Sequence, residues 1–162
     1  MFTKKAVANA LSVLAATFVS CTLFAGDVAA HGPAASLEGV WRVSRHGVNC
    51  ATGEEVSTFP ALMMFRADGS ISGQAVAPGS TNAYGPAEFG DWHRNERGRG
   101  SSFRLLSYNY DDAGVIAGSI EVTGTAELTG ANAFAYHASI EFYDANGNLL
   151  FTRCGKATGL RF

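Results

Sequence analysis

The chain has 162 residues, of which 47% are hydrophobic and 16% charged, and its formal net charge is −2 at pH 7. This length suits one domain with a modest core, and the near-neutral charge excludes the broad basic face that nucleic acids require. The one basic concentration, residues 94–99, is better explained as a solvated hairpin turn. We therefore expect no nucleic-acid partner.

Residues 1–30 predict a Sec-type signal peptide. Lys4 and Lys5 precede an apolar run over residues 6–25, and the small residues 28–30 offer a cleavage site. A membrane anchor is the first alternative, because the apolar run approaches the length that spans a bilayer. The cleavage site favours the signal peptide, so we expect no stable membrane span after processing.

Lipidation of Cys21 is a second alternative, because Phe18-Val19-Ser20-Cys21 loosely resembles a bacterial lipobox. In either case the folded part is expected to be one exported domain, residues 31–162, in the periplasm or outside the cell. Its ten basic and thirteen acidic residues give this part a charge of −3.

Two cysteines, Cys50 and Cys154, remain after processing. An even pair in an exported chain predicts a disulfide, which could stabilise a loop of about 100 residues by roughly 4 to 5 kcal/mol. The alternative, a nucleophilic cysteine or a metal site, lacks the CxxC spacing and the nearby histidines that would support it. We expect no metal and no cofactor.

Alternation of apolar and polar residues predicts strands throughout the domain and no helix. The pattern is clearest over residues 116–128, where the even positions are apolar or glycine and most odd positions are polar. Residues 134–142 repeat it, and turn residues 144–148 follow. Eight strands are predicted, over residues 39–46, 58–66, 71–76, 89–94, 101–110, 116–128 and 133–142, and from residue 149 to the last residue.

Eight antiparallel strands joined in sequence predict either an up-and-down barrel or a two-sheet sandwich. A bond between Cys50 and Cys154 would make the first and last strands neighbours and close the sheet, which removes its exposed edges. With residues 50 and 154 opposite each other, Val43 would face Arg161 and Ser44 would face Leu160. The predicted fold is therefore an all-β, eight-stranded antiparallel barrel closed by its first and last strands.

The first and last strands also carry a family resemblance. Gly39-x-Trp41 and Arg161 resemble the lipocalin and wider calycin pattern, which implies a tryptophan packed under an arginine at the closed end of a barrel. We expect Trp41 and Arg161 to be structural, with a cation–π contact of about 1 to 2 kcal/mol. The chain departs from lipocalins because it is shorter, lacks a Thr-Asp-Tyr turn motif and has no helix after its last strand.

A second resemblance comes from short motifs spread over the domain. The chain is similar to a group of small exported bacterial proteins, which implies fold and export but no activity. The motifs are Asn49-Cys50-x-Thr52-Gly53, Tyr110-Asp111, Asp144-x-Asn146-Gly147-Asn148 and the ending from Cys154 to Gly159-x-Arg161-Phe162.

The end of the barrel away from Trp41 receives the two longest predicted loops, residues 47–57 and 77–87, so we expect the mouth there. A barrel of eight strands is wide enough to be filled by side chains or to hold one small ligand, and both alternatives stay open. Large apolar and aromatic side chains near the mouth suit a small hydrophobic or aromatic ligand with a polar group. The predicted inward, ligand-binding set is Tyr108, Tyr110, Ile116, Ile120, Ile140 and Phe142.

An enzyme would need a positioned acid or base. Asp91 and His93 share a strand face and are the weak catalytic candidates, but Trp92 is expected to point inward, which would leave both as surface groups. The leading hypothesis is thus a ligand-binding barrel. The alternatives are a barrel-lumen isomerase, cyclase or hydratase, and a filled barrel that acts through its outer surface.

Overall fold

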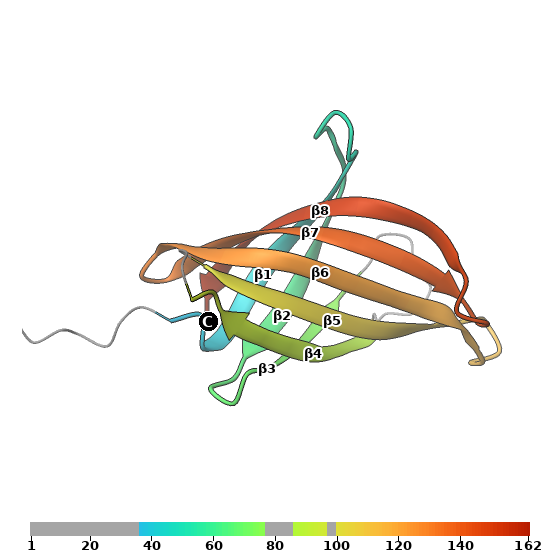
Figure 1. Cartoon of the computed structure of the whole chain (residues 1–162), viewed down its shortest axis with the longest axis horizontal. Helices are drawn as coiled ribbons and strands as arrows, with labels where there is room; N and C mark the ends of the chain where they lie inside the picture. Colours follow the sequence, from blue (N-terminus) through green and yellow to red (C-terminus); the bar gives the residue numbers. More distant parts are fainter. Residues whose placement is uncertain (1–35, 77–85, 97–99) are drawn as a thin grey trace, which may run out of the picture. The chain divides into compact units, whose positions relative to one another are not determined.

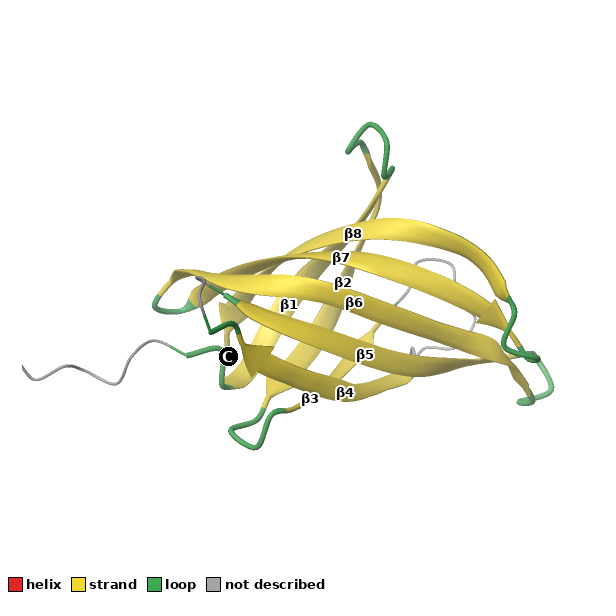
Figure 2. Ribbon diagram, in the orientation of Figure 1, coloured by secondary structure: helices red, strands yellow, loops and turns green. Residues whose placement is uncertain are grey.

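A computed structural model of the chain describes residues 36–76, 86–96 and 100–162. The predicted signal peptide, with its alternatives of a membrane anchor and a lipid on Cys21, lies outside these residues, as does most of the long loop predicted over 77–87. The described part consists of strands and loops (Figure 2). None of its residues form a helix long and apolar enough to cross a bilayer.

The described residues form one closed sheet of eight antiparallel strands. Each strand is hydrogen-bonded to its neighbours in sequence, and the last strand to the first, so the predicted up-and-down barrel is confirmed (Figure 1). The strands are β1 (Gly39–Val48), β2 (Glu55–Phe65), β3 (Ser70–Ala75), β4 (Ala87–Arg94), β5 (Ser101–Tyr110), β6 (Ile116–Gly130), β7 (Ala133–Asp144) and β8 (Leu149–Arg161).

The predicted disulfide is also confirmed, because Cys50 is bonded to Cys154 and their Cα atoms lie 5.1 Å apart. The register inferred from it was wrong by two residues. Cys154 lies opposite Val48, and Arg161 lies opposite Trp41. The reason is that β1 ends at Val48, so Cys50 lies in the following turn and the disulfide crosses diagonally to β8.

Val43 consequently faces Gly159, and Leu160 faces Arg42 rather than Ser44. A shift of two residues keeps every side chain on its predicted face, because strand side chains alternate with a period of two. The residues of β1 and β8 that were predicted to face the lumen, and those predicted to face outward, are therefore unchanged by the error in register.

Large side chains fill the half of the barrel farthest from the disulfide. Trp41 and Phe134 meet edge to face with centroids 4.9 Å apart, and Phe65 contacts both Phe134 and Trp92 in the same geometry. The even positions of β6 and β7 face this core as predicted. Position 124 holds glycine because a Cβ there would lie only 2.8 Å from the Phe103 ring, too close for a larger residue.

Trp41 and Arg161 close this end of the barrel, as the expected structural pair. The Arg161 guanidinium carbon lies 4.2 Å from the Trp41 ring centroid, and its terminal nitrogens donate to the carbonyls of Glu38 and Ser36 at 2.6 Å. The indole Nε1 donates to the carbonyl of Leu37 at 2.6 Å. The segment before β1 is thereby folded across the closed end.

Candidate functional site: the barrel lumen

The other half of the lumen is not filled. A cavity of about 370 Å³ lies between the ends of the strands that lead to the β1–β2, β3–β4, β5–β6 and β7–β8 connections. Its apolar wall comes from β2, β6 and β7, which contribute Phe59, Ile120, Val122, Ile140 and Phe142. The volume falls within the range of small-molecule pockets.

The inner end of this cavity carries a buried ion pair. Arg45 on β1 reaches across the lumen to Glu88 on β4, and its two terminal nitrogens donate to the two carboxylate oxygens at 2.5 and 2.6 Å. The side chains are only 8% and 10% exposed. Such a pair is retained only with good geometry, because removing two charges from water is costly.

Gly73 on β3 makes room for this pair. It lies directly opposite Glu88, and a Cβ at this position would lie 2.6 Å from a Glu88 carboxylate oxygen and 3.4 Å from an Arg45 terminal nitrogen. The Arg45 Nε is buried and has no hydrogen-bond partner among the described residues. The guanidinium is therefore only partly satisfied by the protein.

Tyr136 on β7 lies in the same row as Arg45, since both are paired with Ala157 of β8. Burial raises the pKa of Tyr136 to about 12, and the nearby charges of Arg45 and Glu88 act on it in opposite directions. The ring packs edge to face on Phe103. Burial lowers the pKa of Arg45, but Tyr136 and Glu88 more than offset this and leave it raised.

At the mouth, Phe142 and Arg153 line the cavity, and Phe151 lies against both of them. Phe142 and Phe151 are stacked with centroids 4.4 Å apart, and the Arg153 guanidinium carbon lies 5.8 and 5.2 Å from the two rings. The cavity therefore has a polar inner end, an apolar wall and a cationic rim.

Three of the predicted ligand-binding residues, Ile120, Ile140 and Phe142, line this cavity. Ile116 does not line it: this residue lies opposite Tyr110, beyond the register shift between β5 and β6, and is half-exposed. Whether any of them contacts a ligand stays a prediction.

The predicted inward orientation of Tyr108 and Tyr110 was wrong. Both point outward and are 47% and 51% exposed, because the buried residues Phe103, Leu105 and Ser107 place the odd positions of β5 inside. β5 carries apolar residues on both faces, so its own pattern did not fix its orientation. On the outside, the two tyrosines border a shallow depression of about 280 Å³.

Asp91 and His93 are exposed on the outer face of β4, and Trp92 between them is buried, as expected for surface groups. They form no acid–base pair in the lumen. Among the described residues, no cluster of three histidine, cysteine or acidic side chains is placed to hold a metal ion.

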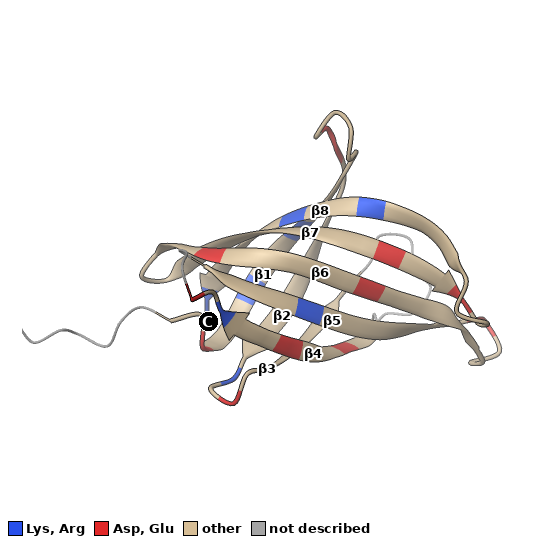
Figure 3. Cartoon of the chain, viewed as in Figure 1, with Lys and Arg blue, Asp and Glu red and all other residues tan. Residues whose placement is uncertain are grey.

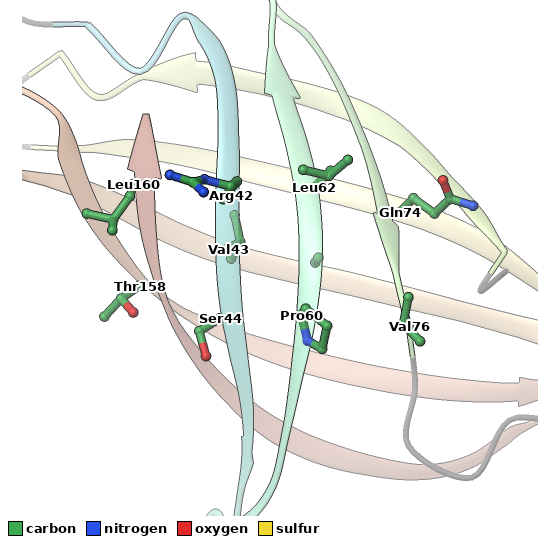
Figure 4. Close-up of a pocket in the computed structure, with 10 residues that line it drawn as sticks. Arg42, Val43, Ser44, Pro60, Leu62, Gln74, Val76, Thr158 and Leu160 are labelled. Carbon is green, nitrogen blue, oxygen red and sulfur yellow. The ribbon is translucent and has the colours of Figure 1, made fainter. Parts of the chain in front are cut away.

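A larger depression of about 690 Å³ lies on the outer surface over β8, β1, β2 and β3. Figure 4 shows Leu160, Arg42 and Leu62 side by side in one row across the strands, with Pro60 and Val76 in the next. It is wide and open to solvent. The lumen is the better candidate site because it combines enclosure with convergent polar groups.

Sequence reasoning missed Arg45, Glu88 and Gly73. Arg45 follows Trp41 and Val43 at two-residue spacing, and Glu88 has the same relation to Trp92, so each could have been recognised as a charge on an inward face.

Elsewhere, Lys and Arg are interspersed with Asp and Glu along the visible strands (Figure 3).

Comparison of this chain with protein-family models and with curated protein sequences finds no match. The class that the geometry defines is a closed, eight-stranded, up-and-down β-barrel with a partly open lumen.

Proposed function

We propose that this protein is an exported, lipocalin-like barrel that binds a small hydrophobic or aromatic molecule in its lumen. The observation that carries the proposal is the cavity of about 370 Å³, which has an apolar wall from β2, β6 and β7 and the polar groups of Arg45, Glu88 and Tyr136 at its inner end. This combination is typical of sites that bury an apolar ligand and orient it through one polar group.

The family assignment within this proposal is supported by Trp41 packed under Arg161, the arrangement that the resemblance implies. The disulfide between Cys50 and Cys154 is consistent with an exported protein, because such bonds persist in oxidising compartments. The candidate residues for a lumen enzyme do not support that alternative, because all four lie outside the lumen: Tyr108, Tyr110, Asp91 and His93.

A fluorescence titration with the neutral dye N-phenyl-1-naphthylamine tests lumen binding. Ile140→Trp places a larger side chain in the cavity and should abolish saturable dye binding. Leu106→Trp is the matched control, because it adds the same indole on the outer face of β5. Thermal melts would establish that both variants are folded.

Two results would overturn the proposal. The first is the absence of saturable binding by the unmodified protein. The second is loss of binding in Leu106→Trp with no effect of Ile140→Trp, which would locate the dye on the outer surface.

A further inference from the structure

Resting on the proposed lumen function, we propose that the cavity selects ligands whose buried end is a neutral hydrogen-bond acceptor. A ketone, ester or amide carbonyl would lie at Arg45 and Tyr136, and a carboxylate would be disfavoured there. The proposal rests on three observations. Arg45 has N–H donors that Glu88 does not use, Glu88 already compensates the charge of Arg45, and the Tyr136 hydroxyl makes no hydrogen bond to a described residue.

The first observation is that the Arg45 guanidinium has N–H donors that its hydrogen bonds to Glu88 do not use. A guanidinium has five N–H donors, and the hydrogen bonds to Glu88 use one from each terminal nitrogen. The Nε has no partner among the described residues, although the side chain is more than nine-tenths buried. The Nε itself is too deeply buried to meet a ligand, but each terminal nitrogen keeps one N–H that Glu88 does not use, and Arg45 lines the cavity, so these N–H groups favour an acceptor supplied by a ligand.

The second observation is that the charge of Arg45 is already compensated. Glu88 accepts from both terminal nitrogens and lines the same cavity. A ligand carboxylate beside Arg45 would therefore introduce a second negative charge close to Glu88 in a poorly solvated site. A neutral carbonyl accepts the same hydrogen bonds without that repulsion.

The third observation concerns Tyr136, which lines the cavity in the same row as Arg45. Its hydroxyl makes no hydrogen bond to any described residue, and burial keeps it protonated far above neutral pH. It is therefore a second donor available to a ligand in the cavity. An anionic group on a ligand would instead lie at the mouth, beside Arg153.

The test compares octan-2-one with octanoate, which have the same chain length and differ in the end group. Methyl NMR signals of Ile120 and Ile140 report on the lumen, and those of Ile71, in the filled half, serve as the internal control. At pH 7, octan-2-one should shift the lumen methyls saturably and bind at least about tenfold more tightly than octanoate.

Two variants and one pH change sharpen the test. Tyr136→Phe should weaken octan-2-one by about two- to tenfold, the value of one hydrogen bond. Glu88→Gln should bring octanoate to the affinity of the ketone or beyond it, because the charge of Arg45 is then uncompensated. If this variant does not fold, the unmodified protein is titrated with octanoate below the ligand's own pKa, where the neutral acid should bind like the ketone.

Failure of the two proposals is distinguishable. If neither probe shifts the lumen methyls, the proposed ligand-binding function is refuted. If octanoate binds at pH 7 as tightly as octan-2-one, or if Tyr136→Phe leaves the affinity of the ketone unchanged, the end-group inference is overturned and the lumen function stands.

Discussion

The ion pair between Arg45 and Glu88 makes a sharp prediction about stability. Arg45→Met leaves the carboxylate of Glu88 buried and unpaired, and Glu88→Leu does the same to the guanidinium. Because both side chains are about nine-tenths buried, each single substitution should lower the free energy of unfolding by about 3 to 5 kcal/mol. The double variant removes both charges together, so it should be near the parent stability or above it by about 1 to 4 kcal/mol.

Urea denaturation followed by the fluorescence of the buried Trp41 and Trp92 measures these changes. The pair Arg104–Glu121 is the matched control, because its 2.7 Å contact lies on the outer surface. Arg104→Met should therefore cost much less than Arg45→Met. If the two arginine substitutions cost the same, or if the double variant is no more stable than either single one, the argument from burial is refuted.

Three further predictions concern other parts of the barrel. The pKa of Tyr136 is raised from 10.0 to about 12. The protonated hydroxyl therefore contributes about 3 kcal/mol to the free energy of unfolding, and this contribution is fully present below pH 10 and lost as the pH rises towards 12. Tyr136→Phe should show a flatter alkaline unfolding profile, and an unchanged slope would contradict this. Replacing Cys50 and Cys154 by serine together should lower the free energy of unfolding by about 4 to 5 kcal/mol, since the bond closes a separation of 104 residues. A reduced and an oxidised parent of equal stability would argue against it. Trp41→Ala should cost about 3 to 5 kcal/mol in urea denaturation because the ring is fully buried, whereas a change below 1 kcal/mol would mean that the closed end repacks freely.

The strands with one clear apolar face were predicted correctly from local pattern. In β6 and β7 the even positions are inside, and both the alternation and the turn residues that follow β7 indicate this without tertiary information. The closed ring also followed from sequence, because one cysteine lies just after the first strand and the other within the last strand. These features depend on neighbouring residues or on one covalent constraint.

β5 shows where such reasoning failed. Phe103 and Leu105 lie on one face, and Leu106, Tyr108 and Tyr110 lie on the other, so hydrophobicity favours neither orientation. Its neighbours β4 and β6 decide, because hydrogen bonding to both fixes which residues face the lumen. Larger aromatic residues on the outer face were therefore mistaken for the lining.

The amino-acid sequence by itself determined the number of strands and the disulfide, because each is encoded in short-range alternation or in a distinctive residue type, whereas the Trp41–Arg161 closure of one end was expected only from the family resemblance. Only the tertiary structure decided the register of β1 on β8, the orientation of β5 and the pairing of Arg45 with Glu88. These depend on how all eight strands close together. Two charges 43 residues apart meet across a lumen only when the curvature of the whole barrel brings β1 and β4 face to face.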